Sequence, residues 1–268
     1  MEQHQHVLIT GGTAGIGFEL ARQFARNGYN LILVARSQEG LENASRELSG
    51  EFPGIHVHTI SKDLFYSDNA FELYNEMKLK NLQVNVLVND AGQGVYGEFV
   101  DTDIRRELAI VQLNISSLIV LTKLFLQDMV ASGQGKILNV ASVAGKLPGP
   151  LQSVYHGTKA FVYSFTQAIR DEVKDKGVVV TALLPGPTDT DFFQKADMEQ
   201  SKIVQEGSMS DPEDVAKDGY EALMAGEDKI VSGWKNKVQV AIGNLTPDSM
   251  IAATMLKQQE PVEKKKMN

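Results

Sequence analysis

The chain has 268 residues, of which 43% are hydrophobic, and it carries a formal net charge of -8. A chain of this length and composition can bury a sizeable core, and it fits one large α/β domain better than two small ones. The negative charge disfavours nucleic acid and anionic lipid as partners, so small-molecule chemistry is the better expectation. The absence of cysteine excludes disulfides, thiol catalysis and cysteine-ligated metal.

The start of the chain, MEQHQHVLIT, lacks a basic segment followed by a long apolar run, so we expect no signal peptide. The most apolar long segment, residues 108–121, is interrupted by Gln112, Asn114 and two serines. It is shorter than the roughly 20 residues that a membrane-spanning helix needs. We therefore expect a cytoplasmic protein with no membrane partner.

Short runs rich in β-branched residues recur along the chain, and helical patterns such as 17–28 and 41–52 lie between them. The predicted strands are 6–10, 30–35, 55–60, 84–89, 135–141, 178–184 and 229–232. Several of them are apolar throughout, which is typical of strands covered on both faces. The pattern predicts an α/β fold with a single doubly wound parallel sheet of about seven strands, flanked by helices on both faces.

Nothing in the sequence divides the chain, so we expect one dinucleotide-binding domain over residues 1–260 and a disordered tail over 261–268. Residues 234–259 carry apolar positions beyond the last predicted strand. We interpret them as helices that either complete the subunit or enter an interface between subunits.

The first predicted strand runs directly into the glycines Gly11, Gly15 and Gly17 and then into a helix. In this position glycine allows a tight turn, close approach of a pyrophosphate to the backbone, and packing of the helix on the strand. The free N–H groups at the start of the helix would face the phosphates. An ordinary glycine-rich turn is the alternative for such a motif taken alone.

The second predicted strand ends at Arg36 and Ser37, where chains that bind NAD usually carry an acidic residue. An arginine can pair with the 2′-phosphate of NADP by its charge and its planar donor fork. We therefore expect NADP(H) to be favoured over NAD(H). A surface arginine at a strand end is the alternative.

Tyr155 and Lys159 are four residues apart, so on a helix they share one face. A neighbouring ammonium would favour the phenolate and lower the pKa of the tyrosine from its usual value near 10. Ser142 follows the fifth predicted strand and precedes Tyr155 by 13 residues, so its hydroxyl can reach the same substrate oxygen. These three residues are candidates for general acid and base catalysis.

His156 lies on a different helix face from Tyr155, and we expect a structural or rim-lining role for it. The other four histidines lack a convincing carboxylate or cysteine partner. We expect no catalytic metal.

Four motifs in order, covering roughly residues 6–190, resemble those of the short-chain dehydrogenase/reductase family in its compact single-domain branch. They are TGGTAGIG at 10–17, NDAG at 89–92, YHGTK at 155–159 and PGPTDT at 185–190. Asp90 departs from the family pattern, which usually has a second asparagine there. We expect that departure to affect only the local turn.

The resemblance implies roles for individual residues. The serine orients the substrate carbonyl, the tyrosine exchanges the proton, the lysine also holds the nicotinamide ribose, and Asn114 supports a proton-relay water. The cofactor-binding residues that it implies, together with Tyr155 and Lys159, are Gly11, Thr13, Ala14, Gly15, Ile16, Gly17, Arg36, Ser37, Asp63, Leu64, Asn89, Ala91, Gly92, Pro185, Gly186, Thr188 and Thr190. Asp63 and Leu64 would meet the adenine, and Thr188 and Thr190 the nicotinamide amide.

The combined prediction is an NADPH-dependent oxidoreductase that reduces a ketone or aldehyde to an alcohol, or catalyses the reverse. Residues 188–212 would form a lid over the substrate, with Phe192, Phe193 and Met198 either in the pocket or packed in a short helix. The resemblance also implies a homodimer or homotetramer. Two alternatives stay open: a sensor that binds NADP(H) without turnover, and an epimerase or dehydratase on the same scaffold.

Overall fold

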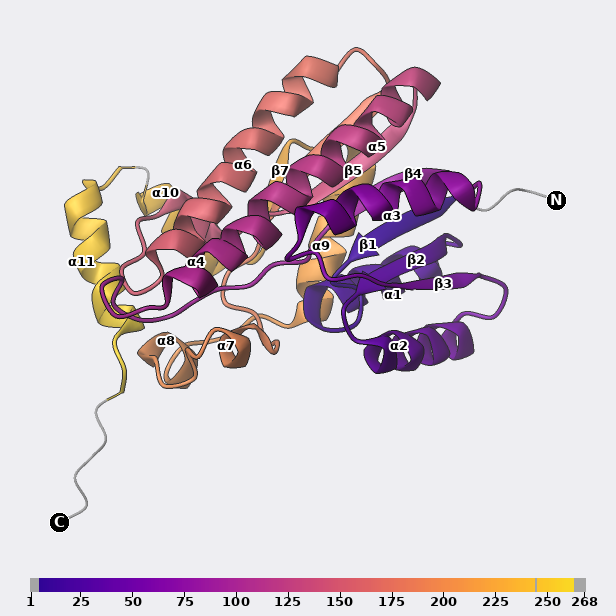
Figure 1. Ribbon diagram of the computed structural model, residues 1–268. Coiled ribbons are helices and arrows are strands. Elements are labelled where there is room, and N and C mark those ends of the chain that lie inside the picture. The colour runs from indigo at the N-terminus through magenta and orange to yellow at the C-terminus, as the bar shows by residue number, and fades with distance from the viewer. Residues whose placement is uncertain (1–4, 244, 263–268) are drawn as a thin grey trace.

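A computed structural model describes residues 5–243 and 245–262, and residues 1–4, 244 and 263–268 lie outside the described part of the chain (Figure 1). Seven parallel strands form one sheet in the order β3-β2-β1-β4-β5-β6-β7, which confirms the predicted sheet. The strands are β1 (His6–Thr10), β2 (Asn30–Ala35), β3 (Val57–Ser61), β4 (Val84–Asn89), β5 (Gly135–Val140), β6 (Val178–Leu184) and β7 (Lys229–Val231). Each begins and ends within two residues of its predicted range.

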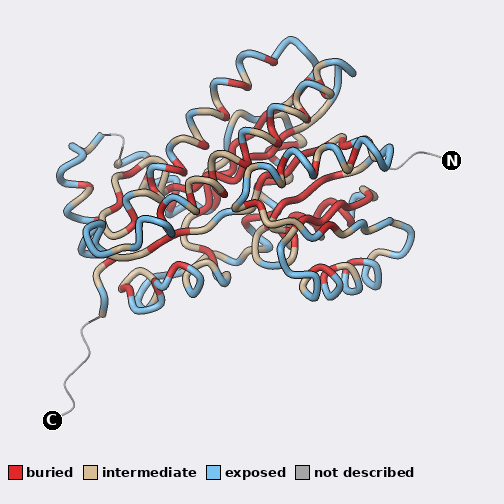
Figure 2. Tube along the Cα trace, viewed as in Figure 1, coloured by how far each residue is buried: buried red, intermediate tan, exposed pale blue. Residues whose placement is uncertain are grey.

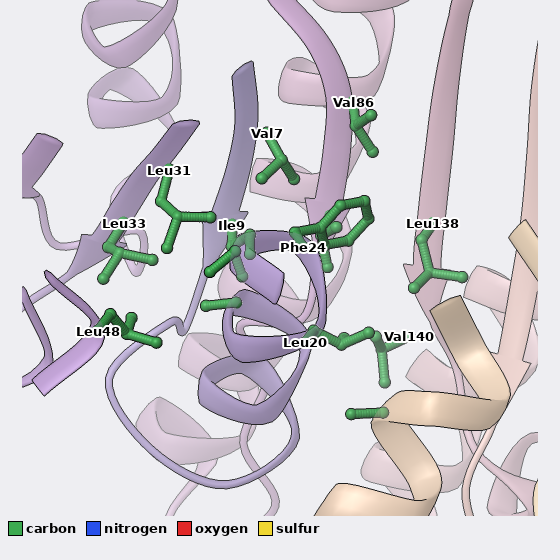
Figure 3. Close-up of a cluster of buried hydrophobic side chains, with 14 of the residues drawn as sticks. Val7, Ile9, Leu20, Phe24, Leu31, Leu33, Leu48, Val86, Leu138 and Val140 are labelled. Carbon is green, nitrogen blue, oxygen red and sulfur yellow. The ribbon is translucent and has the colours of Figure 1, made fainter. Parts of the chain in front are cut away.

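Helices cover both faces of the sheet, which explains why its strands are apolar throughout (Figure 1). One face carries α1 (Gly15–Arg26), α2 (Gln38–Glu51) and α9 (Pro212–Ala225), and the other carries α3 (Ser67–Leu79), α5 (Leu118–Ser132) and α6 (Ser153–Val173). In Figure 3, Leu20 and Phe24 of α1 lie against Val7 and Ile9 of β1. Leu8, between those two strand residues, packs on the opposite face. Figure 2 shows the buried residues concentrated along the strands.

Helix α4 (Ile104–Val111) continues through a π-helical segment (Gln112–Ser117) into α5. This run of 29 residues is long and apolar enough to cross a membrane by length and composition. The apolar helical segment is therefore longer than the expected 108–121. Its residues Leu121, Phe125 and Met129 are buried against the sheet. A helix of a protein core passes the same test of length and composition.

A ladder of polar side chains joins the two central strands. The Asn89 amide on β4 donates to Asn139 Oδ1 on β5 at 2.9 Å and to Thr122 Oγ1 at 3.0 Å. The Asn139 amide in turn donates to Thr166 Oγ1 on α6 at 3.0 Å. Asn89 and Asn139 are also directly opposite each other in the β4–β5 register. The ladder gives partners to both amide nitrogens in the interior, while Asn89 Oδ1 is buried without a hydrogen bond.

The remaining elements gather near the carboxyl ends of the strands (Figure 1). They are a 3₁₀ turn (Val143–Lys146), α7 (Phe192–Lys195), α8 (Lys202–Gln205), α10 (Trp234–Gly243) and α11 (Asp248–Gln259). After α11, Pro261 pairs with Ser201, and the Val262 N–H donates to Gln200 O at 2.8 Å. Disorder was expected from residue 261, but residues 261 and 262 are held by these contacts. The rest of that expected tail lies outside the described residues.

Candidate active site

The turn between β1 and α1 has the conformation that its glycines predict. Gly11 and Gly15 have φ angles of +74° and +56°, a region that favours glycine. A Cβ at Gly15 would lie 2.8 Å from Thr190 Cγ2. Helix α1 begins after Ala14 without a side-chain cap and without an acidic residue in its first turn. No side chain caps the backbone N–H groups at the start of α1, so these groups can bind a pyrophosphate.

The loop after β4 lies against that turn. The N–H groups of Asp90 and Ala91 both donate to Thr10 Oγ1 at 3.1 Å, which ties the loop to the end of β1. Ala91 and Gly92 line the cavity. The side chain of Asn89, expected at the cofactor, is engaged in the polar ladder inside the sheet. The Asn89 side chain therefore supports the loop after β4 from inside the sheet.

Three of the four expected catalytic residues, Ser142, Tyr155 and Lys159, line the same cavity. Ser142 follows β5, and its Oγ accepts from the Ala144 N–H at 3.1 Å and donates to Pro185 O at 3.3 Å. Tyr155 and Lys159 lie on α6, one turn apart. Lys159 Nζ donates to Val140 O at 2.8 Å and lies 5.9 Å from the centre of the Tyr155 ring.

The electrostatics of Tyr155 differ from the expectation. Removal of the hydroxyl from bulk water raises its pKa to about 12, and the neighbouring Ser142 hydroxyl opposes this rise only in part. We expected the Lys159 ammonium to lower this pKa. The ammonium instead donates to a backbone carbonyl, and the charge of Asp90 adds to the rise. The phenol is therefore a proton donor at neutral pH in this structure.

The ammonium of Lys159 is itself perturbed. Burial disfavours its charge and lowers its pKa to about 8, while the charge of Asp90 acts in the opposite direction. Burial likewise raises the pKa of Asp90 to about 7, and Lys159 opposes that rise. The side chain of Asp90 is partly open to the cavity but is shielded from bulk water by the surrounding protein.

Asn114 lies in the π-helical segment between α4 and α5, a kind of distortion that often occurs at functional sites. Its Oδ1 accepts from the Gln93 N–H at 3.0 Å. Its amide donates to Gln93 O at 2.9 Å and to Thr158 Oγ1 at 3.0 Å. Asn114 thus holds the loop after Gly92 against α6, and it is not among the residues that line the cavity. The proton-relay role stays a prediction.

At the end of β2, Arg36 and Ser37 line the cavity as expected. The Arg36 guanidinium lies 4.9 Å from the centre of the Phe65 ring, and Ser37 Oγ caps α2 by accepting from the Gly40 N–H. Lys62 also lines this part of the cavity, although the sequence analysis missed it. Asp63, expected at the adenine, is not among the lining residues, and its carboxylate accepts from the Phe65 N–H at 3.1 Å. Leu64, predicted beside it, does line the cavity.

The loop after β6 forms the opposite wall. Its lining residues include the predicted Pro185, Gly186, Thr188 and Thr190. The Phe192 ring of α7 lies 5.0 Å from the Tyr155 ring, and Phe193 and Met198 line the cavity as well. This segment therefore lies over Tyr155, where the predicted lid would be.

The role of His156 is structural, in line with the expectation. Its Nδ1 lies 2.8 Å from Leu147 O, and its Nε2 lies 3.3 Å from Nε2 of Gln259 at the end of α11. Burial lowers the pKa of the ring, so it is neutral, with Nδ1 as donor and Nε2 as acceptor. Tyr96 also donates to Gln259 O at 2.5 Å. No pattern in the sequence predicts this attachment of α11 to α6.

The cavity has a volume of about 1280 Å³ and extends from Gly11 past Tyr155 to α11. It opens at the carboxyl ends of the strands, at the point between β1 and β4 where the strand order reverses. Such a space can hold a dinucleotide beside an organic substrate. No group of three or more potential metal ligands occurs among residues 5–243 and 245–262.

Comparison with known proteins agrees with this geometry. The model of the short chain dehydrogenase family matches residues 5–201. The very-long-chain 3-oxoacyl-CoA reductase of Rattus norvegicus is 36% identical over 187 residues, which are 66% of this chain and 57% of that protein. The chain thus spans about half the length of the curated relatives that it matches.

Two solved structures are similar over most of the fold. A short-chain dehydrogenase from Sphingobium yanoikuyae in complex with NADPH has a TM-score of 0.80 and 27% identity, over 90% of this chain and 94% of that chain. The bulky-bulky ketone specific alcohol dehydrogenase from Comamonas testosteroni has a TM-score of 0.75 and 26% identity, over 90% and 93%.

Proposed function

The chain belongs to the short chain dehydrogenase family, and on that premise we propose that it is an NADPH-dependent oxidoreductase that reduces a ketone or aldehyde to an alcohol, or catalyses the reverse. The observation that carries the proposal is that Ser142, Tyr155 and Lys159 line one cavity together with the glycine turn. The fold alone does not establish an activity, so the proposal is argued from these three side chains.

A bound nicotinamide cofactor supplies the hydride for this reaction. The chain contributes position and a proton. Ser142 and Tyr155 hold the carbonyl oxygen by hydrogen bonds, and Tyr155 gives that oxygen its proton as the alcohol forms. Lys159 stabilises the negative charge that remains on the phenol. The raised pKa of Tyr155 keeps the phenol protonated at neutral pH, the state from which it can donate a proton in carbonyl reduction.

The preference for NADP(H) over NAD(H) rests on the end of β2. Arg36 lines the wall of the cavity, and Lys62, in the loop after β3, lines the same region. Lys62 also pairs with Glu72 at 2.7 Å, so part of its charge is neutralised. Arg36 makes no ion pair with a described residue, and its planar donor fork suits a 2′-phosphate.

The substrate portion of the cavity favours an apolar ketone. Phe192, Phe193 and Met198 line it from the lid, and Ile251 and Met255 line it from α11. A 3-oxoacyl thioester is the first candidate, because the curated relatives are named for that substrate class. A ketone with large groups on both sides is the second, after the name of a structural neighbour.

We further propose that residues 1–260 act as one domain with residues 188–212 as its lid, and that the protein forms a homo-oligomer. The apolar side chains of Ile104 and Leu108 on α4 are 58% and 57% exposed, which is typical of a subunit interface. The cytoplasmic location stays a prediction from the sequence.

The experiment that tests the function follows NADPH absorbance with a panel of ketones, aldehydes and 3-oxoacyl thioesters. NADH and the Tyr155→Phe protein are measured alongside. We expect turnover that prefers NADPH and falls by at least about 10²-fold in Tyr155→Phe, the lower range for loss of a general acid. Retained activity in Tyr155→Phe would show that the proton comes from another group. Tight NADPH binding without consumption would support the sensor or epimerase alternative.

A further inference from the structure

Asp90 lies where the cofactor turn, the catalytic helix and the loop after β4 meet. Its carboxylate oxygen Oδ2 would be 2.5 Å from a Cβ at Gly17 and 3.1 Å from one at Gly11, so it packs directly under the turn. The backbone N–H of Gly17, in the first turn of α1, stabilises the carboxylate. The departure from asparagine at this position therefore does more than alter the local turn.

The same carboxylate also acts on the two catalytic side chains of α6. Its negative charge favours the cationic form of Lys159 and disfavours the phenolate of Tyr155. The Lys159 ammonium lies beside the loop that begins at Asp90, because a Cβ at Gly92 would be 3.3 Å from Lys159 Nζ and 3.6 Å from the Asp90 carbonyl oxygen. The two charged groups act on each other through the protein interior. An uncharged asparagine at this position would occupy similar space and exert neither effect.

The other groups around Asp90 cannot replace this charge. The turn from Gly11 to Gly17 contains no ionisable side chain, and the wall from β5 presents Ser142. On α6 the ionisable groups facing Asp90 are Lys159 and Tyr155. Lys159 Nζ otherwise contacts the neutral Val140 carbonyl. Burial alone would lower the pKa of Lys159 further, toward a neutral amine at working pH.

We propose that Asp90 is a positioning residue whose negative charge keeps Lys159 protonated beside Tyr155 while its carboxylate supports the first turn of α1. It contacts neither the expected reaction centre nor the transferred proton. Its effect reaches the reaction through Lys159 and Tyr155, and only the kinetic consequence rests on the proposed function.

The direct test measures the titration of Lys159 in the full chain without substrate. The protein is labelled with ¹³C at the lysine Cε atoms, and the signal of Lys159 is identified by its absence in Lys159→Arg. We expect a midpoint near pH 8 in the original protein. In Asp90→Asn the midpoint should fall by about one unit or more, the lower range for loss of a charge nearby.

Two further variants separate charge from shape. Asp90→Ala removes the charge and also the oxygen under Gly17, so it should show the same fall in the Lys159 midpoint with an added loss of thermal stability. Glu107→Gln neutralises another buried carboxylate, on α4, and should leave the midpoint unchanged. An unchanged midpoint in Asp90→Asn, or a fall confined to Asp90→Ala, would overturn the proposal.

The kinetic test is the pH profile of kcat/KM for carbonyl reduction, which needs Tyr155 protonated and Lys159 cationic. Removing the Asp90 charge lowers the pKa of both groups, so the alkaline limb should move to lower pH in Asp90→Asn. An alkaline limb that stays in place in an active Asp90→Asn enzyme would contradict the proposal. If neither the original protein nor any variant reduces a carbonyl, the proposed function fails. The Lys159 titration then still decides the role of Asp90.

Discussion

At the scale of single residues, the site combines side chains that sequence spacing can relate and others that only the fold brings together. Tyr155 and Lys159 are one helical turn apart, so their common face was predictable. Asp90 acts on Lys159 across 69 positions in the chain, and Lys62 lies beside Arg36 because β3 pairs with β2. No local pattern reveals such neighbours, and the charge of Asp90 adds to the rise in the Tyr155 pKa that burial causes.

Arg36 provides the test of cofactor choice at this scale. Arg36→Ala should raise KM for NADPH by about 10-fold to 100-fold, since a hydrogen bond to a charged group contributes about 1.5 to 3 kcal/mol. KM for NADH should hardly change, because that cofactor has no 2′-phosphate. Steady-state kinetics with both cofactors measure the effect, and Arg46→Ala on the outer surface of α2 is the matched control. Equal losses with the two cofactors would assign Arg36 to the part that they share.

At the scale of elements, the strands and the helices within 234–259 were predictable, and the contacts of those terminal helices were not. Apolar runs bounded by polar residues mark strands of a doubly wound sheet wherever they occur, and all seven were found within two residues. The sequence of residues 234–259 shows apolar positions but does not indicate which part of the protein they pack against. Its attachment to α6 depends on Gln259 meeting His156 and Tyr96, which lie more than 100 positions away in the chain.

The attachment of α11 predicts a measurable loss of stability. Gln259→Leu keeps the volume of the side chain but leaves His156 Nε2 without its donor. The free energy of unfolding should fall by about 1 to 3 kcal/mol, the usual range for a buried polar group left unsatisfied. Thermal denaturation measures the loss, and amide hydrogen exchange should become faster over residues 248–259. Gln258→Leu, at the exposed neighbouring position, should change neither measurement.

The same contact predicts a dependence on acid. Burial lowers the pKa of His156 in the folded protein, so the unfolded chain binds more protons once the pH falls below about 6.5. The contribution of His156 is present above that pH and is lost as the pH falls. Denaturant unfolding at pH 7.5 and 5.5 should therefore show a larger loss for the original protein than for His156→Asn. His56→Asn, which changes an exposed histidine, should behave like the original protein; equal losses in all three would contradict this account.

At the scale of the whole molecule, several surfaces expose apolar side chains. One includes Ile104 and Leu108 on α4, and another includes Trp234, Val238 and Ile242, one turn apart along α10. Chain length, composition and strand pattern predicted one α/β unit, since such properties depend on the total core that the chain can bury. They could not predict which exposed face meets another subunit, because that depends on the shape of a surface built from distant segments.

We expect the α4 surface to form the interface between subunits. Leu108→Glu should convert the oligomer to a smaller species in light scattering coupled to size-exclusion chromatography, because an unpaired charge in an apolar interface is strongly unfavourable. Val238→Glu on α10 is the matched change at the other surface and should leave the mass unchanged. Dissociation by Val238→Glu alone would assign the interface to α10, and a monomeric original protein would rule out both.

The polar ladder between β4 and β5 also has a consequence for how the sheet assembles. Asn89 and Asn139 face each other in the observed alignment of the two strands. A shift by one residue would place Leu138 or Val140 opposite Asn89 and break the hydrogen bond from the Asn89 amide to Asn139 Oδ1. Loss of that bond in a dry interior destabilises the incorrect pairing by about 1 to 3 kcal/mol. The two asparagines therefore discriminate against misaligned folding intermediates, a selectivity that an entirely aliphatic pair of strands would lack.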